Sequence, residues 1–209
     1  MTITRQAHIL FASTNAGKIR EAQAAAAQLC LEVISPEQAI SAGYARSTRI
    51  PVVEENAATY EGNARLKADA FFEWCGLPSL ADDTGLEVEI LGRAPGLYSA
   101  RYAGAGATSA KNRAKLLEVM AGKANRQARF YSCLVLKQAP ARYLVAEGAI
   151  AGEIACKESG QGGFGYDNVF VVNGFSETLA VLKEREVSVV THRIAALRAL
   201  VDKIKASTL

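Results

Sequence analysis

Hydrophobic and polar positions in the first quarter of the chain predict a strand, a helix and a second strand. An apolar run at 8–12 enters a turn, and helix-forming residues at 18–29 follow it, so we expect a strand–turn–helix opening. A short second strand is expected at 31–34, and the residues at 36–51 have the composition of a loop.

A longer helix is predicted at 59–75, because apolar side chains recur there with the period of an α-helix. Asn63 and Lys67 are four residues apart on the opposite side, which makes them neighbours on one face of that helix. Another helix is expected at 110–121, and Gly122 ends its pattern.

The rest of the chain carries mostly strand patterns before a final helix. Alternating and β-forming residues predict strands at 86–90, 128–137, 143–156 and 168–172. The last helix has an apolar stripe that includes Leu197 and Val201, and Thr191 suits its N-cap. Strands alternate with helices at both ends around a hairpin-rich block. This order predicts an α/β fold with a mixed sheet flanked by helices.

The composition is that of an ordinary globular protein, and it narrows the classes of function. The 209 residues, 50% of them hydrophobic and 22% charged, suit one domain over 1–209. A net charge of +3 is too small to indicate nucleic acid, and no apolar run approaches the ~18 residues of a membrane span. The N-terminus does not resemble a signal peptide, and the four cysteines lie far apart. We therefore expect a cytoplasmic protein with reduced thiols and with no membrane or nucleic-acid partner.

The turn between the first strand and the first helix has the composition of an anion site. Its residues are Ser13, Thr14, Asn15, Ala16, Gly17 and Lys18. Backbone N–H groups at a helix N-terminus attract phosphate, and a lysine adds to this attraction. Ala12 and Ile19 stand where a P-loop has glycine and the magnesium-binding Ser or Thr, so that motif is excluded. An asparagine cap beside a solvated lysine is the alternative interpretation.

Two acidic pairs are candidates for catalysis or metal binding. Asp82 and Asp83 leave a predicted strand, where adjacent side chains point to opposite faces, so we expect them to have different roles. One carboxylate would orient a hydroxyl or a turn, and the other would act as metal ligand or general base. Glu54 and Glu55, just before the helix at 59–75, are further oxygen ligands suited to Mg²⁺. Solvated acidic turns are the alternative for both pairs.

Two further segments have the composition of a binding site for a flat ligand. Residues 160–167 match GxGxxG, but a strand follows them, so a dinucleotide site is not expected. Glycines around Phe164 and Tyr166 suit a loop on which a ring stacks, or alternatively a tight turn with buried aromatics. His192 and Arg193 at a helix start suit recognition of a carbonyl or phosphate, unless they are solvated. Together with the acidic pairs, these segments predict a Mg²⁺-dependent site for a purine nucleotide.

Six motifs, in their order and spacing, resemble the inosine/xanthosine triphosphate pyrophosphatase family. They are FASTNAGK, TYEGNARLKA, LADDTGLEV, APGLYSARYAG, GGFGYD and THR, and they extend over nearly the whole chain. The resemblance implies an elongated fold of two lobes with a central cleft, usually in a homodimer. It also implies an enzyme that uses Mg²⁺ to hydrolyse noncanonical purine nucleoside triphosphates, namely XTP, ITP and dITP, to the monophosphate and pyrophosphate. Such an enzyme cleanses the nucleotide pool.

The resemblance further implies roles for individual residues. Asp83 matches the general base, and Glu54 and Asp83 match the magnesium-linked acids. The phosphate cradle matches Ser13, Thr14, Asn15, Ala16, Gly17, Lys18 and Lys67, with Thr84 beside it. The base-recognition pocket matches Phe164, Gly165, Tyr166, Asp167, His192 and Arg193.

Two positions depart from the family pattern. Val187 stands where the family has a lysine that contacts the ligand, and Lys183 and Arg185 are the nearby cations that would compensate. Asn168 replaces a proline after the Gly-Tyr-Asp motif. Two alternatives therefore stay open. One is a pyrophosphatase with shifted substrates, such as modified pyrimidine triphosphates, and the other is a nucleotide-binding sensor without turnover.

Overall fold

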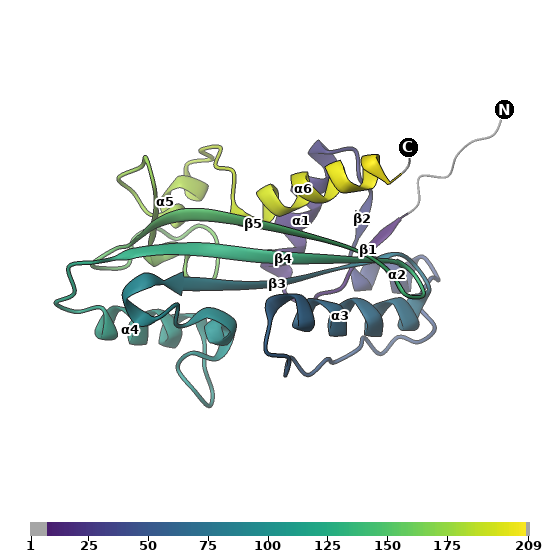
Figure 1. Cartoon of the computed structure of the whole chain (residues 1–209), viewed down its shortest axis with the longest axis horizontal. Helices are drawn as coiled ribbons and strands as arrows, with labels where there is room; N and C mark the ends of the chain where they lie inside the picture. Colours follow the sequence, from purple (N-terminus) through teal and green to yellow (C-terminus); the bar gives the residue numbers. More distant parts are fainter. Residues whose placement is uncertain (1–7, 208–209) are drawn as a thin grey trace. The chain divides into compact units, whose positions relative to one another are not determined.

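A six-stranded mixed sheet is flanked by helices (Figure 1). The computed structural model describes residues 8–207. The strand order is β2-β1-β3-β4-β5-β6. β1 (Ile9–Phe11) pairs in parallel with β2 (Val33–Ile34) and β3 (Ser79–Val88), whereas β5 (Arg142–Ile154) is antiparallel to β6 (Phe170–Val172). The predicted mixed sheet is therefore confirmed.

The chain divides into two compact units. Among the described residues, unit 1 comprises 8–83, 132–148 and 193–207, and unit 2 comprises 84–131 and 149–192. Along the chain, β3, β4 (Gln127–Ala139) and β5 each pass from one unit into the other. Each unit buries hydrophobic residues of its own.

Unit 1 has a hydrophobic core on each face of its part of the sheet, because successive strand residues point to opposite faces. α1 (Ala16–Gln28) and α6 (His192–Ala206) cover one face, where Phe11, Leu80 and Leu197 are buried. α2 (Pro36–Ser41) and α3 (Tyr60–Cys75) cover the other face, where Leu10 and Phe71 are buried (Figure 1). The sheet of unit 1 is thus enclosed between two helical layers.

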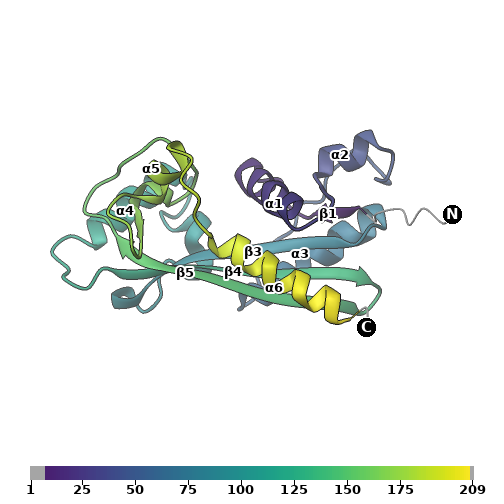
Figure 2. The ribbon, with the colours of Figure 1, turned by 90° about the horizontal axis from the view of Figure 1, so that it is seen from above.

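Unit 2 is built around a core that α4 (Ser109–Val119) and α5 (Leu179–Glu184) share with the strands (Figure 2). The rings of Phe130 and Phe170 pack edge to face with centroids 4.7 Å apart. Three short 3₁₀ helices lie in the connections of this unit: η1 (Glu89–Leu91), η2 (Gly96–Arg101) and η3 (Asp167–Val169).

Three local predictions are wrong. The expected loop at 36–51 contains α2, which begins with a reciprocal capping box between Ser35 and Gln38. The sequence pattern predicts no helix at α5, and the end of the predicted strand at 86–90 is the 3₁₀ helix η1. Asn63 and Lys67 lie on one face of α3, as predicted, where both are buried in contact with Asp83.

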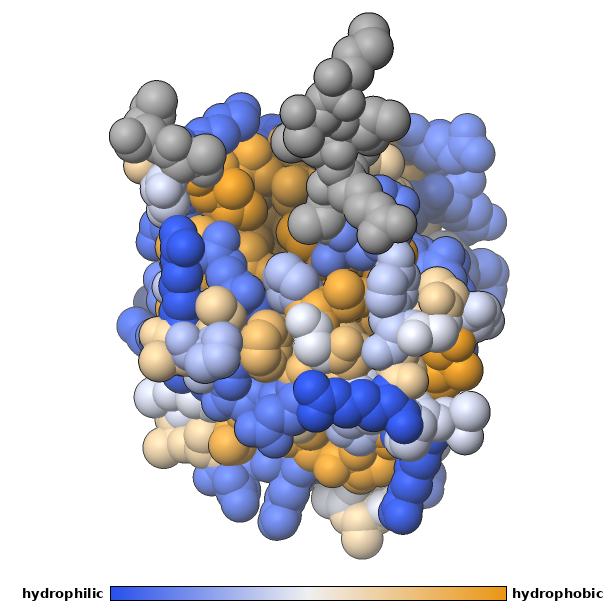
Figure 3. Space-filling view, turned by 90° about the vertical axis from the view of Figure 1, so that its right-hand side faces the viewer, coloured by the Kyte–Doolittle hydropathy of each residue, from blue (hydrophilic) through white to orange (hydrophobic). Residues whose placement is uncertain are grey.

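Hydrophobic and hydrophilic residues are interspersed on the face of the molecule in Figure 3. Among the described helices, none is both long and apolar enough to cross a membrane. The N-terminal segment, which does not resemble a signal peptide, includes residues 1–7, and these lie outside the described residues.

Candidate active site

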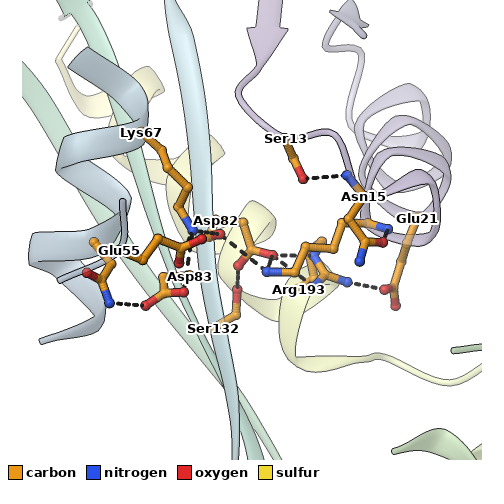
Figure 4. A network of polar contacts seen from close by, with 11 residues as sticks. Ser13, Asn15, Glu21, Glu55, Lys67, Asp82, Asp83, Ser132 and Arg193 are labelled. Carbon is orange, nitrogen blue, oxygen red and sulfur yellow. Dashed lines mark hydrogen bonds and ion pairs between the residues drawn. The ribbon is translucent and has the colours of Figure 1, made fainter. Parts of the chain in front are cut away.

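Asp82 and Asp83, in the middle of β3, direct their carboxylates to opposite faces of the sheet in unit 1 (Figure 4). Asp82 contacts residues of α1 and α6, whereas Asp83 contacts residues of α3. The expectation that the two acids have different surroundings is confirmed. The difference follows from the alternation of side chains along a strand.

Asp82 is the centre of a buried polar network. Its carboxylate accepts hydrogen bonds from Ser132 Oγ at 2.6 Å and from Arg193 Nε at 2.9 Å. Lys18 Nζ lies 3.3 Å from the same carboxylate. With its charge balanced in this way, Asp82 suits a structural role, and the predicted orientation of a hydroxyl is seen at Ser132.

Arg193 is fully buried and bridges two carboxylates. Its guanidinium contacts Asp82 through Nε and Nη2, and it pairs with Glu21 of α1 through Nη1. A buried arginine with two carboxylate partners connects α6, α1 and β3 within unit 1. Its predicted contact with a base stays a prediction, and the contacts described here belong to the Asp82 network.

The N-terminus of α1 carries the predicted phosphate cradle. Asn15 caps the helix, and its side chain accepts a hydrogen bond from the Lys18 backbone N–H at 3.0 Å. Ser13 Oγ accepts one from the Asn15 N–H at 3.2 Å, and Thr14 and Ala16 are exposed. Gly17 lies in the first turn. The asparagine cap of the alternative interpretation is present, but it coexists with a helix N-terminus that presents N–H groups to solvent.

Lys18 is mostly buried, which excludes the solvated lysine of that alternative. Its ammonium lies 3.4 Å from the Asp82 carbonyl oxygen as well as near the Asp82 carboxylate. Burial lowers the pKa of Lys18 from its usual value, and Asp82 opposes this effect. An ammonium that is desolvated in this way interacts strongly with an anion that reaches it.

Asp83 lies in a second polar cluster, on the α3 side. Asn63 Nδ2 donates to Asp83 Oδ2 at 3.2 Å, and Lys67 Nζ lies 3.4 Å from Oδ1. Lys67 also donates to Glu55 at 2.9 Å and to the Asp82 carbonyl at 2.9 Å. Burial raises the pKa of Asp83, although Lys67 opposes the shift. A carboxyl with a raised pKa is suited to accept a proton near neutral pH.

The loop before α3 supplies two more acids to unit 1. Glu55 contacts Lys67, and although burial acts to raise the pKa of Glu55, the nearby ammonium outweighs it and lowers the pKa. Glu54 is exposed. Asn63 holds this loop, because its side-chain oxygen accepts a hydrogen bond from the Ala57 N–H at 2.9 Å.

A magnesium ion suits the oxygen ligands on this side of the sheet. Within residues 8–207 no group of three or more His, Cys, Asp or Glu side chains is arranged to hold a metal. Mg²⁺, however, is usually held by one or two carboxylates, with water and substrate phosphates completing its shell. Asp83 and Glu55, which both contact Lys67, supply two carboxylates of this kind, and Glu54 precedes Glu55 in the loop. The assignment of Glu54 and Asp83 as ligands stays a prediction.

In unit 2, the predicted base-recognition loop is packed closely against its surroundings. Gly163 has a positive φ of 74°, and a Cβ at this position would lie 2.2 Å from Asp167 Oδ2. That carboxylate oxygen accepts a hydrogen bond from the Phe164 N–H at 2.9 Å. Only glycine therefore fits at this point of the turn.

The two aromatic residues of the loop differ in exposure. Tyr166 is buried and donates its hydroxyl to the Ser99 carbonyl at 2.9 Å, and burial raises its pKa. Phe164 is half-buried. The alternative of a turn with buried aromatics thus holds for Tyr166, whereas Phe164 keeps surface on which a ring can stack.

The other predicted residues of unit 2 are His192, Thr84 and Gly165. His192 is buried and stacks on Phe130, with ring centroids 4.9 Å apart. Thr84 is half-buried. Gly165 presents its carbonyl to Arg113 Nη1 at 2.9 Å. Arg113, from α4, is a contact that the sequence analysis missed.

Other contacts were also absent from the sequence predictions. Glu21 and Ser132 complete the Asp82 network, and Asn63 binds Asp83. The sequence did contain a signal for Asn63, because its spacing of four residues places it on the same helix face as Lys67. The sequence contained no such signal for Glu21 and Ser132, since their partners are distant in sequence and neither residue belongs to a motif with a recognisable spacing.

The fold and the carboxylate–lysine clusters are those of an α/β protein whose buried cations suit an anionic ligand. The sequence profile of the Ham1 family matches residues 9–203, and the chain belongs to this family. The dITP/XTP pyrophosphatase of Chromobacterium violaceum is 41% identical over 200 residues, covering 95% of this chain and 97% of that protein. That of Haemophilus influenzae is 40% identical over 200 residues, with coverage of 94% and 98%.

Solved structures agree with the family assignment. The Ham1 protein of Staphylococcus aureus is 32% identical, with a TM-score of 0.78 and coverage of 96% of this chain and 99% of that one. A HAM1 protein from Coxiella burnetii is 34% identical, with a TM-score of 0.79 and the same coverage. The family resemblance derived from the six sequence motifs is confirmed.

Proposed function

We propose that this protein hydrolyses noncanonical purine nucleoside triphosphates, namely XTP, ITP and dITP, to the monophosphate and pyrophosphate. Curated relatives at about 40% identity over nearly their full length carry the name dITP/XTP pyrophosphatase, which supports this activity. The observation that carries the proposal is Asp83, a buried carboxyl of raised pKa beside Lys67 and Asn63. Such a group suits a general base that activates water.

The triphosphate would be bound by the cationic groups of unit 1. Lys18 and Lys67, held in place by Asp82 and Asp83, and the N-terminal N–H groups of α1 offer positively charged or polarised donors to a ligand with about four negative charges. Hydrolysis of a phosphoanhydride depends mostly on positioning and charge stabilisation, so these groups are the kind that the reaction needs. Asp82 holds Lys18 in place through its carboxylate and carbonyl oxygens.

Magnesium is part of this proposal. Asp83 and Glu54 would hold the ion, and Glu55, which contacts Lys67 beside Asp83, offers a further carboxylate. When bound, Mg²⁺ neutralises phosphate charge and lowers the pKa of bound water. Asp83 would accept the proton of the attacking water, while Lys67 keeps its contacts with Glu55 and with the Asp82 carbonyl.

The family resemblance assigns base recognition to Phe164, Gly165, Tyr166, Asp167, His192 and Arg193. A 6-oxo purine accepts hydrogen bonds where the 6-amino group of adenine donates them, so a site built from donors rejects ATP. Phe164 offers a ring for stacking, and the loop that carries it is fixed by Asp167 and Tyr166. Discrimination against GTP is harder, because guanine shares the 6-oxo group.

Turnover of the purified protein with Mg²⁺ on XTP, ITP, dITP, GTP, ATP and dUTP tests this function. We expect pyrophosphate rather than orthophosphate from XTP, ITP and dITP, with ATP nearly inert. Preferential turnover of a modified pyrimidine triphosphate would instead favour the shifted-substrate enzyme. If nothing is hydrolysed while ITP still raises the melting temperature, the protein is a nucleotide-binding sensor.

Two further properties belong to the same proposal. We propose a homodimer and a cytoplasmic location, where such an enzyme meets the nucleotide pool. Light scattering coupled to gel filtration gives the mass in solution, and twice the 22.2 kDa of one chain is expected. A monomer at micromolar concentration would contradict the dimer without affecting the proposed reaction.

A further inference from the structure

The glycine-rich loop of unit 2 is packed directly on α5. A Cβ at Gly162 would lie 2.5 Å from the Ala180 carbonyl oxygen, and one at Gly160 would lie 2.6 Å from the Val181 nitrogen. The Gln161 N–H donates to the Glu184 carboxylate at 3.1 Å. Side chains of α5 are therefore in a position to reach the residues that the loop presents.

Lys183 of α5 contacts two of the predicted base-recognition residues at once. Its ammonium lies 3.0 Å from Asp167 Oδ2 and 5.4 Å from the centroid of the Phe164 ring. The Asp167 side chain is only 5% exposed and that of Lys183 is 25% exposed, so salt screens this pair less than it would an ion pair on the surface. The distance to the ring is within the range of cation–π attraction.

Position 187, where the family resemblance places a lysine, carries no charge in this protein, because it is a valine. Val187 is exposed and follows the end of α5 at Glu184. Lys183 precedes it by four residues and lies within α5, and it is a cation that contacts both Phe164 and Asp167.

We propose that Lys183 is a specificity-determining residue of the purine site and supplies the positive charge that position 187 lacks. The inference rests on the function proposed above. A fixed ammonium beside the stacking ring attracts the electronegative edge of a 6-oxo purine and repels the N–H donors of adenine. By holding Asp167, it also fixes the turn that carries Phe164.

Binding of IMP and AMP, measured by calorimetry without Mg²⁺, tests the site independently of catalysis. We expect Lys183→Met to weaken IMP binding by roughly 10- to 100-fold, the loss of one charged contact, and to leave AMP binding unchanged or stronger, because the repulsion of the adenine N–H donors is removed. Lys183→Gln keeps a donor toward Asp167 and removes the charge, so it should fold even if Lys183→Met does not. It should show the same loss of preference for IMP.

Arg185→Met is the matched control, because it also removes one cation from the end of α5. Arg185 pairs with Glu177 at 2.6 Å on an exposed part of the surface. We expect this variant to change IMP affinity by about threefold or less. In the Lys183→Met background, Val187→Lys should recover part of the lost IMP affinity, since it returns a cation to the same segment.

Kinetics with ITP separate failure of this inference from failure of the proposed function. If the unaltered protein hydrolyses ITP and both Lys183 variants bind IMP as it does, Lys183 has no role in specificity and only the inference falls. If the unaltered protein neither hydrolyses ITP nor binds IMP, the proposed function is wrong, and so is the inference that rests on it. A rise in KM for ITP at constant kcat in Lys183→Gln, with the Arg185 control unchanged, supports the role.

Discussion

The two regions that carry the predicted site residues are held together by different physical means. In unit 1, ion pairs between side chains hold the site residues: the charge of Asp82 is balanced by Arg193 and Lys18 in a buried network. In unit 2, the loop that carries Phe164 depends on close packing of glycines and on hydrogen bonds to the backbone. The first region is held mainly by ion pairs, whereas the second combines close packing with the ion pair between Lys183 and Asp167.

Because of this difference, the two regions tolerate different kinds of amino-acid substitution. A buried ion-pair network is sensitive to the removal of one charge, because the partner is then left uncompensated. A loop packed on glycines is sensitive to added volume, even of one methyl group. Substitutions chosen by charge and by volume therefore probe the two regions separately.

The largest effect on stability is expected for Arg193→Met. It leaves the buried carboxylates of Asp82 and Glu21 without their shared partner, and we predict a loss of about 3–5 kcal/mol in the free energy of unfolding. Urea denaturation measures it. Arg65→Met is the control, since Arg65 pairs with Glu61 on the helix surface and its loss should cost less than about 1 kcal/mol. Equal effects of the two substitutions would mean that the Asp82 network contributes no special stability.

Gly163→Ala should have the next largest effect. The substitution adds a clash with Asp167 to the strain of a positive φ, and we expect a loss of about 2–3 kcal/mol together with a higher KM for ITP. Gly122→Ala is the matched control. Gly122 has a φ of 70° with nothing within 4 Å of the added Cβ, so only the strain of about 1–2 kcal/mol remains. A Gly163→Ala protein no less stable than the control would show that the loop is not closely packed.

Tyr166→Phe should have the smallest effect. It removes the hydroxyl that donates to the Ser99 carbonyl, but this oxygen also accepts a hydrogen bond from Asn112 Nδ2 at 3.2 Å. Because the acceptor stays satisfied, we expect a loss of about 0.5–1.5 kcal/mol by thermal or urea unfolding. Tyr98→Phe, at a side chain that is 61% exposed, should cost almost nothing. A loss of several kcal/mol in Tyr166→Phe would mean that unit 2 also depends on a polar network.

Sequence patterns predicted the parts of the structure that local geometry controls. Alternation along a strand placed Asp82 and Asp83 on opposite faces, and helical spacing brought Asn63 and Lys67 together. The mixed sheet followed from the order of the strand and helix patterns. Short helices such as α2 and α5 were missed, because six residues give too little periodicity to tell a helix from a loop.

Contacts between distant segments could not be predicted in this way. Arg193 is separated from Asp82 by 111 residues and from Glu21 by 172, and no local signal joins them. The burial of Lys67 follows from partners that come from a loop and from β3. Which charged residue is buried depends on the tertiary fold, whereas which face a residue occupies depends on its own helix or strand.

The most direct test of the proposed function compares Asp83→Asn with the unaltered protein on ITP and Mg²⁺. Pyrophosphate release gives kcat, and calorimetry with IMP gives affinity in the absence of turnover. We predict a fall in kcat of about 10²- to 10⁴-fold, with IMP affinity and melting temperature nearly unchanged, since Lys67 keeps Glu55 and the Asp82 carbonyl as partners. An Asp83→Asn protein that retains most of its rate would show that Asp83 is not the general base.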